Sequence, residues 1–475
     1  MPNGPGDVGD EPESPFEAAY TAGITRELPE PVLPAGRTAV VSAAPAETFA
    51  LRGCLLTPDG PLERGYITVG EGIAIAAIST RKPRNVPVLD TEGGVIMPGL
   101  IDLHGHPEFN VFAAWEPPRQ FVNRYAWRGS EIYKELVRRP QDRLIAALPR
   151  QTQLRYAEIR ALVGGVTAIQ GTSERVERLE EESLVRNVDR WIFGRHRARA
   201  MIDLPDDGER DFPRLQRILA EIDDGAVDAF YVHLAEGRRD NQRSVDEWDR
   251  LVRTNALTAA TVVIHGTALG RDQLGEMKDA GAKLVWSPQS NLRLYGETTL
   301  AADALEVGLK VGLGADWLPT GSQSLLHELR VARRELNGQG TEPGARRLVE
   351  MVTSDAAEIA GLGDELGRLE VGRPADLVVL ERRVADPYEN VLDAEPSWVQ
   401  LVMLDGDLPY GRADWLETLA DPGDRQRLEP LIAWGKRMLL DTSHTAAAPT
   451  GEQPPLGLLR EQLIGEYPQV GPIFA

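Results

Sequence analysis

The chain has 475 residues, enough for one large domain of about 250 residues or more and a smaller one. Its formal net charge of −21 disfavours a nucleic-acid partner, because phosphate backbones are bound by concentrated Lys and Arg. A single cysteine, the absence of a secretory signal and the absence of any apolar run near the roughly 18 residues of a spanning helix together predict a cytoplasmic protein without disulfides or membrane contacts.

The N-terminal part of the chain divides by composition. Residues 1–45 are rich in Pro, Gly and acidic residues, and we expect a mostly disordered leader. Residues 46–96 contain short apolar runs separated by turn residues, as in a small β unit. From 97 to 365, apolar strands alternate with amphipathic helical segments. This alternation predicts a parallel sheet, and the number of units predicts a (β/α)₈ TIM barrel of the α/β class.

The C-terminal part returns to β-like patterns. Residues 366–410 contain LGRLEVGRPADLVVL and VQLVMLDGDLPYG, which we expect to complete a composite β-sandwich with residues 46–96. Residues 411–475 are expected to form a partly helical tail, with RLEPLIAWGKRMLL as a helical segment.

Two histidines stand one residue apart in GVIMPGLIDLHGH. We interpret VIMPGLIDLHGH as a buried strand whose end carries both His104 and His106. Two neutral imidazoles that converge on one point suit a divalent metal, whereas a surface pair in a loop is the alternative.

Three further polar residues end predicted barrel strands. His233 ends DAFYVH, His265 ends TVVIH and Asp316 ends KVGLGAD. Active sites of this fold lie at the C-terminal ends of the strands, so these side chains should share one rim with His104 and His106. The remaining histidines, His196, His327 and His444, are expected to be structural.

Two more segments are placed at this rim. Glu236 follows His233 by three residues, where a partly desolvated carboxyl could carry protons; a solvated helix-start carboxylate is the alternative. SPQSN follows the predicted strand KLVW and delivers Asn291 to the same mouth, although alone it is only a turn pattern.

Taken in order, these motifs resemble the amidohydrolase superfamily, in its cytosine deaminase-like and chlorohydrolase-like branch. The resemblance covers residues 50–410 and rests on PGLIDLHGH, HLAE, VIHG, SPQSNLRL, GLGAD and LGRLEVGRPADLVVL. It implies His104, His106, His233 and Asp316 as metal ligands, Glu236 and Asp316 as proton carriers, and His265 as a group that polarises water or substrate.

The resemblance also bears on the number of metal ions. Binuclear members use a carboxylated lysine on the fourth strand, but the only lysine between His106 and His233 is Lys134, in a predicted helix. One divalent ion is therefore expected, with zinc the first choice and iron the alternative; a bridging Asp203 is a minor alternative.

The chain departs from the family pattern near the mouth. Trp317 follows Asp316 where the deaminases have a small residue, and Trp115 and Arg119 lie in an unusual segment after the first barrel strand. With Asn291, these side chains are candidates for contact with a planar or anionic substrate, while loop packing is an equal alternative for the Trp and Arg residues.

The sequence therefore predicts a metal-dependent hydrolase of C–N bonds other than peptide bonds. Our first hypothesis is an aminohydrolase of a nitrogen heterocycle or amidine that releases ammonia. The alternatives are a hydrolase of cyclic or small amides and, from a different class, a non-catalytic scaffold. The expected partner is a small-molecule substrate, and a homo-oligomer is left open.

Overall fold

The structure is a computed structural model that describes residues 48–70, 74–171, 183–420, 427–442 and 454–474. The predicted leader and His444 lie outside the described residues. Within them, no helix combines the length and the apolar composition that crossing a membrane requires.

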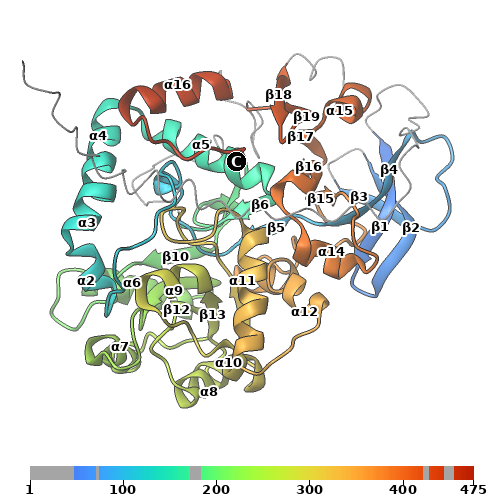
Figure 1. The fold of residues 1–475 in the computed structure, drawn as a ribbon. Helices are drawn as coiled ribbons and strands as arrows, with labels where there is room; N and C mark the ends of the chain where they lie inside the picture. The colour runs from blue at the N-terminus through green and yellow to red at the C-terminus, as the bar shows by residue number, and fades with distance from the viewer. Residues whose placement is uncertain (1–47, 71–73, 172–182, 421–426, 443–453, 475) are drawn as a thin grey trace, which may run out of the picture.

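The two ends of the described chain meet in one sheet of nine strands. Its order is β18-β19-β17-β16-β15-β4-β1-β2-β3. The strands are β1 (Phe49–Thr57), β2 (Gly60–Val69), β3 (Ile75–Ser79), β4 (Val88–Pro98), β15 (Leu377–Leu380), β16 (Val399–Leu404), β17 (Asp407–Arg412), β18 (Glu429–Ala433) and β19 (Lys436–Leu440). β15 pairs antiparallel with β4, which places N-terminal and C-terminal strands side by side (Figure 1). The two segments therefore share one sheet, while its division into the two layers of a sandwich stays a prediction.

Eight other strands form two parallel sheets in the middle of the chain. One sheet has the order β10-β11-β12-β13-β14, and the other has the order β5-β6-β7. The strands are β5 (Leu100–Asp102), β6 (Val166–Ile169), β7 (Arg186–Asn187), β10 (Ala198–Met201), β11 (Ala229–Leu234), β12 (Thr261–His265), β13 (Lys283–Trp286) and β14 (Lys310–Leu313). A bridge between Gly105 and Asp316 joins the ends of β5 and β14. The fold is thus α/β with parallel and mixed sheets, and closure into one barrel stays a prediction.

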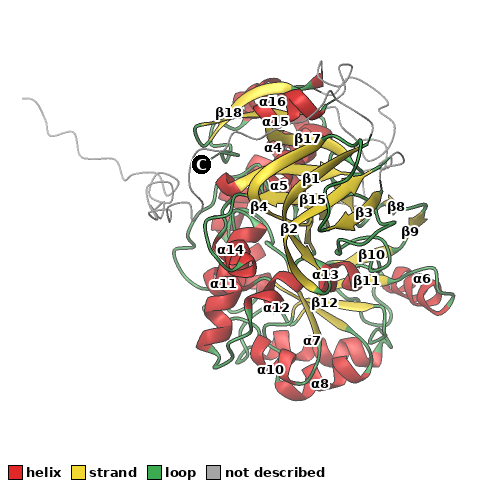
Figure 2. Ribbon diagram, turned by 90° about the vertical axis from the view of Figure 1, so that its right-hand side faces the viewer, coloured by secondary structure: helices red, strands yellow, loops and turns green. Residues whose placement is uncertain are grey.

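Helices such as α8 and α10 lie on the outer side of the parallel strands, whereas α15 packs against the nine-stranded sheet (Figure 2). In chain order, the helices of the described residues are η1 (Pro107–Phe109), α2 (Arg124–Arg128), α3 (Glu131–Tyr133), η2 (Lys134–Arg138), α4 (Arg139–Ala147), α5 (Arg150–Val163), α6 (Phe212–Asp223), α7 (Gln242–Arg253), α8 (Arg271–Asp279), α9 (Pro288–Tyr295), α10 (Ala301–Glu306), α11 (Leu325–Gly338), α12 (Ala345–Glu350), α13 (Ser354–Ile359), α14 (Pro387–Asp393), η3 (Pro396–Trp398), α15 (Ala413–Leu419) and α16 (Leu456–Glu466). In α7, Trp248 and Leu251 are buried three residues apart, which is the spacing of one helix face. A short hairpin of β8 (Trp191–Ile192) and β9 (Arg195–His196) precedes β10.

The segment VIMPGLIDLHGH is not one strand, contrary to our expectation. β4 ends at Pro98 in the nine-stranded sheet, and β5 begins at Leu100 in a parallel sheet. A Cβ atom at Gly99 would lie 2.1 Å from Oγ1 of Thr167 in β6, so only glycine fits where the chain passes from one sheet to the other.

The segment RLEPLIAWGKRMLL was predicted to be helical, and this was wrong. β18 and β19 pair antiparallel, and Trp434 and Gly435 between them have φ values of 48° and 77°. Two successive positive φ values match the twist of a tight hairpin turn, and glycine tolerates them without strain. The composite β unit consequently extends past residue 410.

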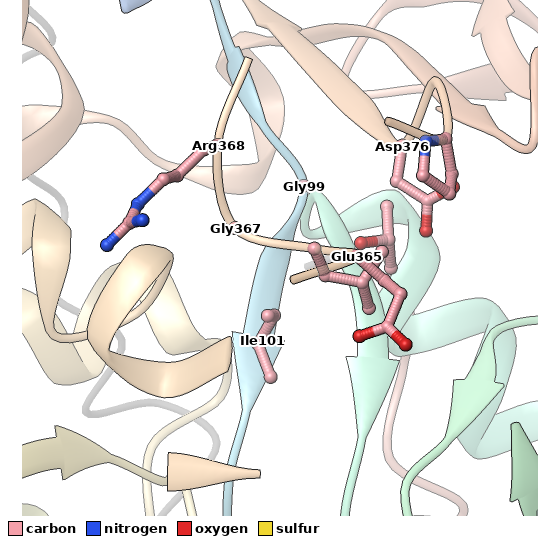
Figure 3. A pocket seen from close by; sticks show the side chains of 9 residues that line it. Gly99, Ile101, Glu365, Gly367, Arg368 and Asp376 are labelled. Atoms are coloured by element: carbon pink, nitrogen blue, oxygen red, sulfur yellow. The ribbon is translucent and has the colours of Figure 1, made fainter. Parts of the chain in front are cut away.

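A small crevice marks the junction between the two parts of the fold (Figure 3). It is lined by Gly99 and Ile101 on one side and by residues 365–368 on the other, and Asp376 lies at its edge. Nearby, the buried guanidinium of Arg186 in β7 donates to both carboxylate oxygens of Asp376, at 2.6 and 3.0 Å. This ion pair ties a parallel strand to the nine-stranded sheet.

Candidate active site

Six polar side chains converge at the C-terminal ends of the parallel strands. They are His104 and His106 after β5, His233 in β11, Glu236 just beyond it, His265 at the end of β12, and Asp316 beyond β14. They form three overlapping groups of three residues, and within each group the potential ligand atoms lie within 4.8 Å of one another. The site residues that the sequence placed at one rim are therefore close together in space.

The carboxylate of Asp316 lies at the centre of this cluster. Its Oδ1 atom is 3.3 Å from Nε2 of His104 and 3.5 Å from Nε2 of His106. The same oxygen accepts the backbone N–H of Trp317 at 2.8 Å. The side chain of His106 is 26% exposed, whereas those of His104 and Asp316 are 1% and 6% exposed, so solvent reaches the cluster on the His106 side.

Burial sets the charge state of three of the imidazoles. Burial lowers the pKa of His106 to about 3 and the pKa of His265 to about 3, and it lowers the pKa of His233 well below its usual value. All three rings are therefore neutral near pH 7, which is the form that binds a metal ion. Burial also acts to lower the pKa of His104, but the neighbouring carboxylate of Asp316 raises that pKa overall.

The pKa values of the two carboxyl groups in the cluster, Asp316 and Glu236, are shifted in opposite directions. Burial alone would raise the pKa of Asp316, but the neighbouring imidazoles, His104 foremost, hold it well below its ordinary value. Burial raises the pKa of Glu236, and the positive charge of Arg124 only partly opposes this. One group thus favours the ionised form and the other favours the protonated form.

The donor set fits a metal ion. Neither ring nitrogen of the buried His104 makes a hydrogen bond of good geometry in the described chain, although Nε2 lies 3.3 Å from Oδ1 of Asp316. A buried polar atom without a partner is costly unless a ligand satisfies it. Neutral imidazoles with one carboxylate are a ligand set that zinc accepts.

The side chains considered as a bridge between two metal ions lie elsewhere. Lys134 is 41% exposed and pairs with Glu131, and Asp203 pairs with Arg124 and Arg128. Neither belongs to a metal-ligating group among the described residues.

Asp102 fixes the relative position of the ligand-bearing loops. Its Oδ1 atom accepts the backbone N–H groups of His104 (3.3 Å) and Ala315 (3.0 Å), which belong to the segments after β5 and β14. Burial raises its pKa to about 7. Asp102 lies within the PGLIDLHGH motif, but the sequence alone indicated no role for it.

Asn291 orients His265. Its Nδ2 atom lies 3.0 Å from Nδ1 of His265, and its Oδ1 atom accepts from Oγ1 of Thr298 at 3.3 Å. In this arrangement Nδ1 of His265 accepts, so the ring proton lies on Nε2, which faces the cluster. SPQSN forms the start of helix α9 and not a loop, and the amide of Asn291 is fully buried. Both of its polar atoms are thus engaged within the protein.

Glu236 lies between two partners. Its Oε1 atom accepts from the hydroxyl of Tyr295 at 2.5 Å, and its Oε2 atom lies 3.8 Å from Nε2 of His265. The side chain is 9% exposed and precedes α7 by several residues, so Glu236 is not a solvated carboxylate at a helix start.

A buried ion pair supports the loop that carries Glu236. Oε2 of Glu247 in α7 accepts the backbone N–H of Ala235 at 2.7 Å and a guanidinium N–H of Arg124 at 2.8 Å. Ala235 has a φ of +52°, so this contact stabilises an unfavourable backbone between His233 and Glu236. Sequence reasoning missed Arg124, Glu247 and Tyr295, because charged residues in helices and an aromatic residue in SPQSNLRLY are ordinary surface and core patterns.

Aromatic rings cover the exposed side of the cluster. Trp317 lies 6.2 Å from the ring of His106 and 5.9 Å from the ring of Trp127. Trp115 packs behind them, 5.3 Å from Trp127. Arg119 is exposed and stacks over Phe121 at 5.6 Å, so its guanidinium joins the aromatic loop and not the histidine cluster.

Two other described histidines lie outside the site. His196 in β9 is 3.0 Å from the carbonyl oxygen of Asp189, and His327 lies in α11. Neither belongs to a metal-ligating group among the described residues.

Comparisons with known proteins agree with this geometry. The model of the amidohydrolase family matches residues 214–408, which carry His233, Glu236, His265 and Asp316. This part of the chain resembles the amidohydrolase family, in agreement with the motifs read from the sequence.

Proteins similar to this chain include deaminases and a chlorohydrolase. A 5-methylthioadenosine/S-adenosylhomocysteine deaminase of Symbiobacterium thermophilum is 24% identical over 380 residues, which are 68% of this chain and 82% of the relative. An adenosine deaminase from Xanthomonas campestris with bound zinc superposes with a TM-score of 0.60 at 16% identity, covering 78% of this chain and 94% of that one. Atrazine chlorohydrolase from Arthrobacter aurescens in complex with zinc superposes with a TM-score of 0.61 at 19% identity, covering 76% and 95%.

Proposed function

We propose that this protein is a metal-dependent aminohydrolase that replaces an amino group on a nitrogen heterocycle, or on a related amidine, with oxygen. The observation that carries the proposal is the meeting of two buried carboxyl groups, Glu236 and Asp316, with four histidines in one cluster; the pKa values of the two carboxyl groups are also shifted in opposite directions. Such pairs supply an acid and a base to one reaction. The deaminase names among the relatives support the same reaction.

His104, His106, His233 and Asp316 would hold one divalent metal ion, with zinc the first choice. The zinc in both structural relatives and the ring nitrogens of His104, neither of which makes a hydrogen bond of good geometry, support this assignment. When bound, the ion would supply the Lewis acidity that brings the pKa of a water molecule towards about 7.

The side chains of the protein would handle the protons. Asp316 is ionised and would accept a proton from the attacking water, while Nε2–H of His265 would donate a hydrogen bond to its oxygen. Glu236 is favoured in its protonated form and would protonate the ring nitrogen next to the reacting carbon. A C–O bond would form, and the C–N bond to the amino group would break as the proton held by Asp316 passes to the amino nitrogen. The second proton of the water would return to Glu236. One water molecule is consumed and one molecule of ammonia leaves.

The aromatic wall would contact the substrate. Trp317 flanks His106, the cluster member with the greatest exposure, so a planar ring approaching from solvent would meet the indole face. Trp115 would support this wall from behind. Arg119 would act only at its outer edge, and Asn291 would act through His265.

We extend the proposal to the architecture. The eight parallel strands and the bridge between Gly105 and Asp316 support one closed (β/α)₈ barrel over residues 97–365. Residues 46–96 and the strands after residue 366 would form the second unit.

An ammonia-release screen over purines, pyrimidines, pterins and triazines tests the reaction. We expect release from at least one class, at a rate that falls when the metal is chelated and returns when zinc is restored. Ring opening of cyclic amides without ammonia would replace this function with an amide hydrolase of the same superfamily.

The metal assignment predicts about one divalent ion per chain. We expect His104→Ala to lose most of this metal together with activity, because the ring is buried and central to the cluster. Metal analysis of purified protein gives the measurement. His196→Ala, which removes a histidine outside the cluster, is the control and should retain the ion. Two tightly held ions per wild-type chain would contradict a single site.

The acid role predicts a separate effect at Glu236. Glu236→Gln should retain the metal ion but lower kcat by roughly 10² or more, the scale of losing a positioned proton donor. Steady-state kinetics with metal analysis measures both quantities. Glu276→Gln on the exposed face of α8 serves as the control. Full activity of Glu236→Gln would remove Glu236 from the reaction.

A further inference from the structure

A buried tyrosine makes a direct hydrogen bond to Glu236. The hydroxyl of Tyr295 donates to Oε1 of Glu236 across 2.5 Å, and the tyrosine is only 1% exposed. Oε2 of the same carboxyl group faces Nε2 of His265 at 3.8 Å. The two oxygens of Glu236 therefore have different surroundings.

We propose that Tyr295 is a positioning residue that fixes the carboxyl group of Glu236 with Oε2 towards the reaction centre. This inference rests on the proposed function. The terminal torsion of a glutamate is broad, so without a partner the carboxyl plane could turn and neither oxygen would be held facing His265. A donor on Oε1 favours one orientation and assigns the transferred proton to Oε2.

A neutral donor suits a group that gains and loses a proton. Burial raises the pKa of Tyr295 well above its usual value, so its hydroxyl stays protonated and donates. Oε1 can accept this hydrogen bond whether Oε2 carries a proton or not. A cation at the same place would instead favour the ionised carboxylate throughout.

Helix α9 connects this contact to His265. Asn291 and Tyr295 are four residues apart and therefore lie on one face of the helix. Asn291 contacts Nδ1 of His265, and Tyr295 contacts Oε1 of Glu236. One short helix thus orients two groups of the site through side chains from successive turns.

Tyr295→Phe removes the hydroxyl and keeps the ring. We expect a fall in kcat of about 10-fold, the scale of a hydrogen bond to an ionisable group, with KM changed by less than about 2-fold and the metal content unchanged. In the Glu236→Gln background, the same substitution should have no further effect on kcat, because its action passes through the acid. Equal losses in both backgrounds, or no loss in either, would overturn the inference.

Tyr156→Phe is the matched control. Its buried hydroxyl donates to the carbonyl oxygen of Gly471 at 2.9 Å, in contact with the C-terminal segment and not with Glu236. We expect lower thermal stability but unchanged kcat. A fall in kcat equal to that of Tyr295→Phe would show that loss of any buried tyrosine hydroxyl suffices and would contradict a specific role.

Crystal structures of the wild type and of Tyr295→Phe test the contact without activity. We expect one orientation of the Glu236 carboxyl group in the wild type and more than one in the variant. An unchanged orientation would overturn the inference even in an active enzyme. Failure of the wild type to release ammonia from any substrate would instead reject the proposed function, and the crystallographic comparison would still decide the role of Tyr295.

Discussion

Three residues next to the reacting groups adopt left-handed backbone conformations. Ala235, His265 and Asp316 have φ values of +52°, +68° and +60°. Such values cost of order 1 kcal/mol or more for residues with a side chain, so surrounding contacts must hold them. Glu247 does this for Ala235, and the bridge from Gly105 does so for Asp316. Single residues of the site are thus strained to aim their side chains inward.

Glu328 is a fully buried carboxyl group that the proposed reaction does not use. It lies in α11, where its oxygens accept from the hydroxyl of Ser322 and from the backbone N–H of Gln289, the latter at 3.1 Å. Burial raises its pKa to about 8. It joins the segment after β14 to the start of α9, and therefore supports both Asp316 and Asn291 from behind.

This raised pKa predicts a pH-dependent stability. Below about pH 4.5 both folded and unfolded chains are protonated at Glu328, whereas up to about pH 8 only the folded chain is. The contribution of Glu328 to the free energy of unfolding therefore falls as pH rises through this window. Glu328→Gln should gain stability relative to the wild type between pH 5 and pH 8, by more than about 1 kcal/mol. Urea unfolding of the wild type and of Glu328→Gln at pH 5 and at pH 8 measures the two free energies of unfolding. A difference between the two proteins that is equal at both pH values would contradict a raised pKa of Glu328.

Strands β5 and β14 approach each other at a glycine. A Cβ atom at Gly314 would lie 2.5 Å from Cβ of His104 and 2.6 Å from its backbone nitrogen. The close approach of these two strand ends brings His104 within reach of Asp316. The geometry of the cluster therefore depends on how the elements pack as well as on its polar residues.

Gly314→Ala should push His104 away from Asp316. We expect metal affinity to fall by at least about 10-fold, the lower end of the loss seen when residues that position metal ligands are changed. Competition with a chelator measures the affinity. Gly275→Ala in α8 is the same substitution where no atom lies within 4 Å of the new Cβ, so it should leave metal binding intact and stabilise the helix by about 0.5–1 kcal/mol. Unchanged affinity in Gly314→Ala would show that β5 and β14 can separate without affecting the site.

The nine-stranded sheet connects distant parts of the chain. β1 pairs with both β2 and β4, and β4 pairs with β15, so strands from opposite ends of the described chain depend on one another. β4 is followed directly by β5 and His104. Removal of the N-terminal strands would therefore expose the sheet edge next to the segment that leads into the site.

Truncation tests this dependence. Deleting residues 2–30 should leave the fold and the metal content unchanged, because that segment precedes β1 and its composition disfavours a core. Deleting residues 2–75 removes β1 and β2 and should give insoluble protein. The solubility and the metal content of both truncated proteins give the measurement. A soluble, metal-loaded chain that starts at residue 76 would show that the N-terminal strands are dispensable.

Local patterns in the sequence were sufficient to predict the alternation of strands and helices. They were also sufficient to predict which side chains meet at one rim. FYVHLAE, TVVIHG, KLVW and KVGLGAD are strands in the structure, and the polar residue after an apolar strand lies at its end by chain continuity alone. The resemblance to the family was also readable, because His104, His106, His233 and Asp316 stand in ordered motifs. These features depend on neighbours within a few residues, which a sequence displays directly.

Tertiary contacts decided the features that local sequence patterns did not predict. The hairpin at Trp434, the break at Gly99 and the helix at SPQSN each depend on what packs against the segment. Glu247 is on a helix face that could equally have met solvent, and Tyr295 acquires a role only because α9 lies against the segment after β11. Side-chain pairs more than ten residues apart, such as Tyr295 with Glu236, follow from how whole elements pack, and no local period in the sequence encodes that packing.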